Sequence, residues 1–317
     1  MGAPIKTCSK VLLIDIGGTN IRTAIANIGS NDLINPLKRN HNQIISIDAL
    51  IKDFIKENLD IKHIVFSVAG PKINHSISMT NAELQIDRKY ILENFKLDSC
   101  HILNDWESIG HSLSIVKNHE TKFINQGKPF NDVALVLGPG TGLGAALVIK
   151  DEIILPTELG NSSINISKIL QEFIPSNNND FKNVESIISG KGLSKIFFLI
   201  SGLKKNPEEI LATYESDKLA KKSIDIFLIS ISQLLSELAL IYMPGKGIYL
   251  SGALIRNLIR FIDFDSFTKN FLENKKSPHK EILNQMPLAV INKQMASLHG
   301  SLHFINKLNQ KNWKGLF

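Results

Sequence analysis

Two glycine-rich segments lie far apart in the sequence, and each follows a short apolar run that predicts a buried strand. The first segment comprises Asp15, Gly17, Gly18, Thr19 and Asn20. Its glycines allow a tight turn and leave backbone N–H groups uncovered for phosphate oxygens, to which the Thr19 hydroxyl adds a donor. Asp15, at the end of the predicted strand, could hold a hydrated magnesium ion. Taken alone, the segment fits a plain hairpin turn equally well.

The second segment, residues 138–144, has a glycine at every other position. A hairpin turn needs one or two glycines, so the excess favours close approach of a ligand to the backbone. We therefore predict phosphate contacts from Gly140, Thr141 and Gly142. Neither segment is a Walker A loop, because Gly-Lys-Ser/Thr is missing. Neither is a Rossmann fingerprint, because a strand-like pattern follows the glycines where that motif has a helix.

Asn104 and Asp105 stand between an apolar run, residues 100–103, and a helical pattern. Open α/β sheets bind ligands at the carboxyl ends of their strands, and a carboxylate there could take the proton of an attacking hydroxyl. Asp and Asn are also good helix N-caps. Position alone leaves the general base and the cap as equal interpretations of Asp105.

Three further segments carry weaker signals. Glu158 and Asn161 share one of them, Glu185 lies in the second, and Gly252 follows a short strand in the third. Paired carboxylates with an amide suit the hydroxyls of a sugar, whereas each glutamate taken singly fits an ordinary surface position better. Gly252 taken singly fits a small-residue turn.

The predicted elements place these residues in two similar α/β halves, each opening with strand, glycine turn and returning strand, with a boundary near residues 108–132. Between and after them, apolar spacing predicts helices at 47–59, 88–95, 106–116, 164–173, 193–201, 224–243 and 292–308.

The composition is that of an ordinary globular protein, with 43% hydrophobic and 21% charged residues among 317. Two cysteines make no disulfide framework and fit a reducing cytoplasm. The net charge of +6 comes from scattered lysines without an aromatic stripe, so we expect no nucleic-acid partner. Residues 224–243 are apolar but include Asp225 and Glu237, which favours a buried core helix over a membrane span.

In their order and spacing, these motifs resemble the bacterial-type glucokinase family of the hexokinase, actin and heat-shock ATPase superfamily. The resemblance extends from Val11 to about Ile305. It implies two ribonuclease-H-like (actin-like ATPase) α/β domains that flank a cleft. The small domain would comprise residues 1–109 plus a C-terminal helix at about 300–317, and the large domain residues 110–299.

The resemblance also implies an activity: transfer of the γ-phosphoryl group of ATP, with Mg²⁺, to a hexose, most simply D-glucose. It makes Asp105 the general base and Asp15 the metal ligand. The first glycine segment, the second glycine segment and Gly252 would bind the nucleotide. The sugar ligands would be Asn81, Asn104, Glu158, Asn161 and Glu185. Family members are often dimers, so a homodimer is one option.

The segment around Glu158 departs from the family pattern Gly-Glu-Gly-Gly-His, because Thr157, Leu159 and Asn161 replace two glycines and the histidine. These changes predict a reshaped sugar loop. They leave open a kinase for another hexose or amino sugar, and a non-catalytic sugar sensor on the same scaffold.

Overall fold

The computed structural model describes residues 9–40, 46–70, 72–73, 76–78, 85–163 and 181–313. They divide into unit 1, Met1–Ile115 with Gln294–Phe317, and unit 2, Val116–Lys293. We propose that these units are the two domains expected from the sequence, whose limits at 109 and 300 stay predictions. The predicted helix at 164–173 and the predicted sugar ligand Asn81 lie outside the described residues.

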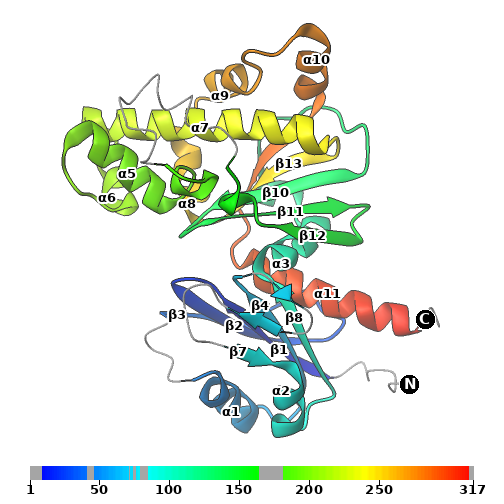
Figure 1. Ribbon diagram of the computed structural model, residues 1–317. Coiled ribbons are helices and arrows are strands. Elements are labelled where there is room, and N and C mark those ends of the chain that lie inside the picture. The colour runs from blue at the N-terminus through cyan, green and yellow to red at the C-terminus, as the bar shows by residue number, and fades with distance from the viewer. Residues whose placement is uncertain are drawn as a thin grey trace. The chain divides into compact units, whose positions relative to one another are not determined.

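Unit 1 is built on a five-stranded sheet (Figure 1). Its strands lie in the order β3 (Ile34–Asn40), β2 (Asn20–Asn27), β1 (Lys10–Ile16), β4 (Ile61–Val68) and β8 (Ser99–Asn104). The hairpin pairs are antiparallel, and β1, β4 and β8 are parallel. The short strands β5 (Lys72–Ile73), β6 (Ser76–Ser78) and β7 (Gln85–Asp87) form a separate small sheet.

Strand β1 is buried on both faces of this sheet. Leu12, Ile14 and Ile16 pack in a core with α1 (Ile47–Glu57) and α2 (Arg88–Phe95). The alternate residues Val11 and Leu13 pack in a second core against α11 (Ala296–Trp313). A strand covered on both sides needs apolar residues at every position, which explains the continuous run that the sequence shows.

Helix α11 also contacts α3 (Asp105–Ser112) very closely. A Cβ atom on Gly300 would overlap the carbonyl oxygen of Ser108, and the Ser301 hydroxyl donates to the Ser108 hydroxyl at 3.3 Å. Only small residues allow helix backbones to approach this far. The C-terminal helix thus supports the helix that begins at Asp105.

Unit 2 repeats the arrangement of an antiparallel hairpin beside parallel strands (Figure 1). Its six-stranded sheet has the order β12 (Ile153–Thr157), β11 (Leu143–Ile149), β10 (Val133–Pro139), β13 (Gly247–Leu250), β14 (Leu288–Ile291) and β9 (Thr121–Asn125). The sequence predicted the β10 and β11 hairpin. It placed residues 292–308 in the last helix, whereas the structure has strand β14 up to Ile291 and starts α11 at Ala296.

The helices of unit 2 pack around α7 (Lys218–Tyr242), which lies across one face of the sheet (Figure 1). They are α5 (Gly190–Ser201), α6 (Pro207–Ala212), α9 (Phe264–Phe271) and α10 (Ser277–Gln285), whereas α8 (Ala253–Leu258) packs against strands β10 and β14. Helix α7 is long and apolar enough to cross a membrane, but 67% of its most apolar window is buried inside the structure. Phe227 and Leu235 on α7 belong to the core of unit 2, which confirms the predicted core helix.

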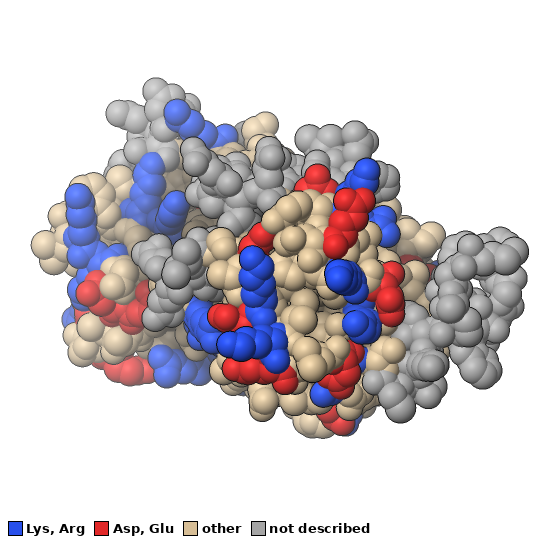
Figure 2. Space-filling model, turned by 90° about the horizontal axis from the view of Figure 1, so that it is seen from below, with Lys and Arg blue, Asp and Glu red and all other residues tan. Residues whose placement is uncertain are grey.

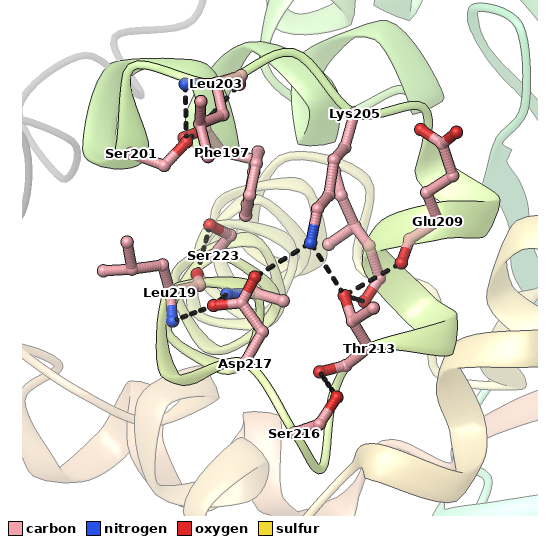
Figure 3. A network of polar contacts seen from close by, with 12 residues as sticks. Phe197, Ser201, Leu203, Lys205, Glu209, Thr213, Ser216, Asp217, Leu219 and Ser223 are labelled. Atoms are coloured by element: carbon pink, nitrogen blue, oxygen red, sulfur yellow. Dashed lines mark hydrogen bonds and ion pairs between the residues drawn. The ribbon is translucent and has the colours of Figure 1, made fainter.

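A polar network fixes the start of α7 (Figure 3). Asp217 caps this helix by accepting from Leu219 N–H and Ala220 N–H. Lys205, in the connection before α6, donates to the Asp217 carboxylate at 2.9 Å and to the Thr213 hydroxyl at 3.2 Å. The hydrogen bond from Lys205 lowers the pKa of Asp217.

The surface carries charges of both signs. On the face in Figure 2, basic and acidic side chains lie interspersed, which is typical of a solvated surface.

Candidate active site

The first glycine segment forms the turn between β1 and β2 in unit 1. Gly17 N–H donates to the Asn20 carbonyl at 3.0 Å, which closes the turn directly after the pair Ile16 and Ile21. Gly18 and Thr19 at its tip are exposed. The turn therefore offers backbone to a ligand at the carboxyl end of β1.

Asp15 lies beside this turn and is only 3% exposed. Its Oδ2 accepts from the Arg22 guanidinium at 2.7 Å, and its Oδ1 accepts from the Ser67 hydroxyl at 2.9 Å. Each carboxylate oxygen can accept a second hydrogen bond, so Asp15 can still hold a water molecule on a metal ion. Two partners from neighbouring strands fix its orientation.

This donor set fits magnesium that arrives with phosphates. Mg²⁺ usually keeps several waters and takes one or two carboxylates together with substrate phosphates, so Asp15 alone is sufficient. Among the residues that the structure describes, no three His, Cys, Asp or Glu side chains gather as a metal site. The Arg22 cation beside Asp15 further disfavours a free divalent ion.

Sequence reasoning missed Arg22 and Ser67. The signal for Arg22 was present, because Asp15 and Arg22 stand at equal distances from the glycine turn and pair across the hairpin. Ser67 lies opposite Asp15 on the parallel strand β4, and no local pattern predicts that register.

Asn104 and Asp105 lie at the junction of β8 and α3. The Asn104 side chain accepts from Trp106 N–H at 2.9 Å and donates to the Gly70 carbonyl at 2.9 Å. Asn104, not Asp105, is therefore the N-cap, and Asp105 is the first residue of α3. The Asp105 side chain is half-buried at this strand end. The Asp105 carboxylate does not cap α3, so the alternative role of helix cap, which the sequence left open, does not apply to it.

The other end of α3 carries a buried histidine. His111 packs against Phe304 of α11, and burial lowers its pKa to about 4, with further lowering by His303 and Lys307. His111 is therefore neutral at physiological pH. It belongs to the support of α3.

The second glycine segment forms the turn between β10 and β11 in unit 2. Gly140 N–H donates to the Gly142 carbonyl at 2.7 Å, and Gly190 N–H at the start of α5 donates to the Gly140 carbonyl at 2.9 Å. Gly140 and Thr141 are exposed. This turn is thus closed like the first, but it is also held from outside by a helix start.

Glu185 touches the same turn. Its Oε2 accepts from Leu143 N–H at 2.9 Å, and a Cβ atom on Gly142 would overlap its carboxylate. A Cβ atom on Gly160 would overlap the Leu143 carbonyl oxygen. The sequence predicted Glu185 as a sugar ligand but gave no sign of this contact with the glycine turn.

Glu158 and Asn161 are exposed neighbours in one turn, where the Asn161 amide donates to the Glu158 carboxylate at 3.1 Å. The reshaping of this loop that the sequence predicts at residues 157, 159 and 161 stays a prediction. Leu159 is 6% exposed and belongs to the core of unit 2, because its side chain points inward. The Thr157 hydroxyl donates to the Ala145 carbonyl at 3.3 Å. Of the three residues that depart from the family pattern, Asn161 is the exposed one.

Gly252 lies at the start of α8 with φ +116, a conformation that favours glycine. A Cβ atom there would approach the Pro139 carbonyl oxygen to 3.4 Å. Gly252 therefore lies close to the strand that leads into the second glycine turn. Unit 2 thus brings together this turn, Glu185 and Gly252, and Val184 N–H joins the Glu158 segment to them by donating to the Ser162 carbonyl at 3.0 Å.

Several bacterial glucokinases are similar to this chain in sequence. A statistical model of the family described as Glucokinase matches residues 12–308. The glucokinase of Brucella suis biovar 1 (strain 1330) is 29% identical over 320 residues, which cover 92% of this chain and 89% of that protein.

Solved structures show the same fold. A glucokinase from Balamuthia mandrillaris in complex with glucose gives a TM-score of 0.78 at 20% identity, covering 96% of each chain. A glucokinase from an Antarctic psychrotroph gives 0.77 at 18% identity, covering 94% of this chain and 99% of the other. The fold is therefore that of the actin-like sugar kinases, as the motif order predicts. Because the family model spans nearly the whole sequence, the chain belongs to the glucokinase family.

Proposed function

We propose that the protein transfers the γ-phosphoryl group of ATP to the 6-hydroxyl of D-glucose, giving ADP and glucose 6-phosphate. The observation that carries this proposal is the placement of Asp105. It follows a parallel strand, stands first in α3, and leaves the capping of that helix to Asn104. A carboxylate so placed can accept the proton of an attacking hydroxyl.

The two glycine turns are the proposed phosphate contacts. In unit 1 they come from Gly17, Gly18, Thr19 and Asn20, and in unit 2 from Gly140, Thr141 and Gly142. Backbone N–H groups in such turns stabilise charge on the transferred group without reorganising. Gly252 is the proposed contact for the adenosine part of ATP.

Asp15 is the proposed ligand of Mg²⁺. The ion, when bound with ATP, neutralises phosphate charge during transfer. Asp15 would hold the ion, and Arg22 and Ser67 keep its carboxylate in one orientation.

The sugar ligands proposed are Asn81, Asn104, Glu158, Asn161 and Glu185. Support for glucose comes from the inward position of Leu159, which leaves Asn161 as the one altered side chain exposed in this turn. We further propose a cytoplasmic location, which suits a chain with two cysteines, and a homodimer as one option for the assembly.

The test is coupled ADP release with MgATP and a panel of glucose, mannose, glucosamine and N-acetylated hexosamines. We expect the highest kcat/KM with glucose. Turnover with another sugar alone would show that the protein is a kinase for that sugar, and we would attribute the preference to the turn that contains Asn161. If the folded protein binds ATP but phosphorylates no sugar of the panel, the proposed kinase activity is wrong and a non-catalytic sugar sensor is favoured.

A further inference from the structure

Glu185 lies where two functional segments of unit 2 meet. Its Oε2 accepts from Leu143 N–H at 2.9 Å, and Leu143 directly follows Gly142, the last residue of the second glycine turn. The residue before it, Val184, donates its N–H to the Ser162 carbonyl at 3.0 Å, next to the Glu158 and Asn161 segment. One side chain thus touches the proposed nucleotide turn from a position adjoining the proposed sugar segment.

The contact is built by two glycines. A Cβ atom on Gly142 would overlap the Glu185 carboxylate. A Cβ atom on Gly160 would overlap the Leu143 carbonyl oxygen and lie 3.1 Å from Glu185 Oε2. Gly142 and Gly160 have no side chain and so leave room for the Glu185 carboxylate at the Leu143 amide. The contact therefore depends on the residue types at three separate places in the sequence.

The Glu185 carboxylate is hydrogen-bonded to the backbone. In the described part of the chain, Oε1 makes no hydrogen bond and no Lys, Arg or His side chain pairs with this carboxylate. A hydrogen bond from an amide to a carboxylate is about twice as strong as one between neutral groups. The Leu143 amide is therefore held firmly, while Oε1 can still accept from a ligand.

We propose that Glu185 is a positioning residue for the nucleotide turn as well as a sugar ligand. Oε2 fixes Leu143 and thereby the shape of residues 140–142, and Oε1 accepts from a sugar hydroxyl. The second half of this inference rests on the proposed function. Because one rigid carboxylate serves both segments, sugar and nucleotide affinities are coupled through it.

The test measures the Kd for MgADP by calorimetry in the absence of sugar. Glu185→Ala removes the acceptor, and we expect the Kd to rise about tenfold. Glu185→Gln keeps a carbonyl oxygen that can accept from Leu143 N–H, so we expect a Kd within about threefold of wild type. Thermal melts confirm that each variant is folded.

Glu158→Ala is the matched control. Glu158 is the other proposed sugar carboxylate, and among the described residues its side chain accepts a hydrogen bond from Asn161 and none from the glycine turn. We expect this variant to lose glucose affinity and to bind MgADP as wild type does. Gly160→Ala, although it lies in the sugar segment, should weaken MgADP binding because its Cβ displaces Leu143.

Two results would overturn the inference. Wild-type MgADP affinity in Glu185→Ala, with glucose affinity lost, would leave Glu185 as a sugar ligand alone. Equal losses of MgADP affinity in Glu185→Gln and Glu185→Ala would show that an acceptor for Leu143 N–H is not enough, and would assign the effect to the negative charge instead of to positioning of the turn. Neither readout depends on glucose turnover, so failure of the proposed function is recorded separately by the sugar panel.

Discussion

The two units build the same hairpin with a glycine turn, but they obtain the carboxylate beside that turn in different ways. In unit 1 the carboxylate belongs to the strand itself, and Asp15 pairs with Arg22 across the hairpin. Strand β10 of unit 2 has no acidic residue, and the carboxylate comes from Glu185, which is 42 residues from the amide that it holds. The carboxylate beside such a glycine turn can thus come from the hairpin itself or from a segment that is distant in sequence.

This difference suggests a division of tasks. The carboxylates of unit 1 stand at strand ends and are proposed to act on the metal and on the attacking hydroxyl, so their loss should lower turnover. The carboxylate of unit 2 is bound to the turn, so its loss should lower nucleotide affinity. Four predictions test this division and the contacts that stabilise each unit.

The largest expected effect is that of Asp105→Asn. The amide keeps the shape of the side chain but cannot accept the hydroxyl proton, so kcat should fall about 10²–10⁴-fold. The Kd for MgADP should stay at its wild-type value. Glu107→Gln, two residues later in α3, keeps an oxygen that can accept from Asn104 N–H and should retain activity. Full turnover by Asp105→Asn would show that Asp105 is not the general base.

Asp15→Asn should have the next largest effect. The substitution keeps an acceptor for Ser67 but leaves Arg22 without its ionic partner, and kcat should fall about 10²–10³-fold. The Mg²⁺ concentration for half-maximal rate should rise. Ser67→Ala, which leaves the ion pair in place, should show a smaller change of the same kind. If Asp15→Asn instead weakens MgADP binding with kcat unchanged, the proposed division of tasks is wrong.

A pH titration separates the stabilities of the units. Burial holds the folded-state pKa of His111 at about 4, below the ordinary 6.5, with His303 and Lys307 facing it from α11. The unfolded chain binds the proton first, so the stabilising contribution of neutral His111 is complete above pH 6.5. It is lost as pH falls towards 4, and amounts to roughly 3 kcal/mol.

Both tryptophans, Trp106 and Trp313, lie in unit 1, so urea unfolding followed by tryptophan fluorescence reports this unit. The free energy of unfolding should fall between pH 6.5 and 4.5 in wild type, and less steeply in His111→Leu. Burial also lowers the pKa of His63, which contributes a remaining slope. Identical slopes in wild type and variant would contradict the assigned role of His111.

The smallest effect is expected for Lys205→Met in unit 2. Loss of the contacts to Asp217 and Thr213 weakens the start of α7, and the midpoint of thermal unfolding followed by circular dichroism should fall by about 2–4 °C. Lys204→Met is the matched control, because Lys204 is an exposed neighbour. Equal shifts in both variants would mean that the network in Figure 3 adds no stability.

Local signals predicted much of the fold and part of the site. The apolar runs before Asp15 and Asp105 identified their strands, and the glycine turns identified both hairpins, because these features depend on neighbours in sequence. Contacts between distant segments were not predictable in this way. The pairing of Glu185 with Leu143 and the inward direction of Leu159 both depend on how η4 (Leu159–Asn161) and η5 (Val184–Ser186) pack together.

The contact between α11 and the sheet of unit 1 also has a consequence for how the chain is made. The face formed by Val11, Leu13 and Val65 leaves the ribosome early, yet its partner α11 follows the whole of unit 2. At translation rates of about 5–20 residues per second, roughly 10–35 s separate residue 115 from residue 294. Unit 2 can fold during that interval while this apolar face waits. The nascent chain can thus complete its second unit before its first. Until α11 is made, the exposed apolar face near the N-terminus is the surface that a chaperone would bind.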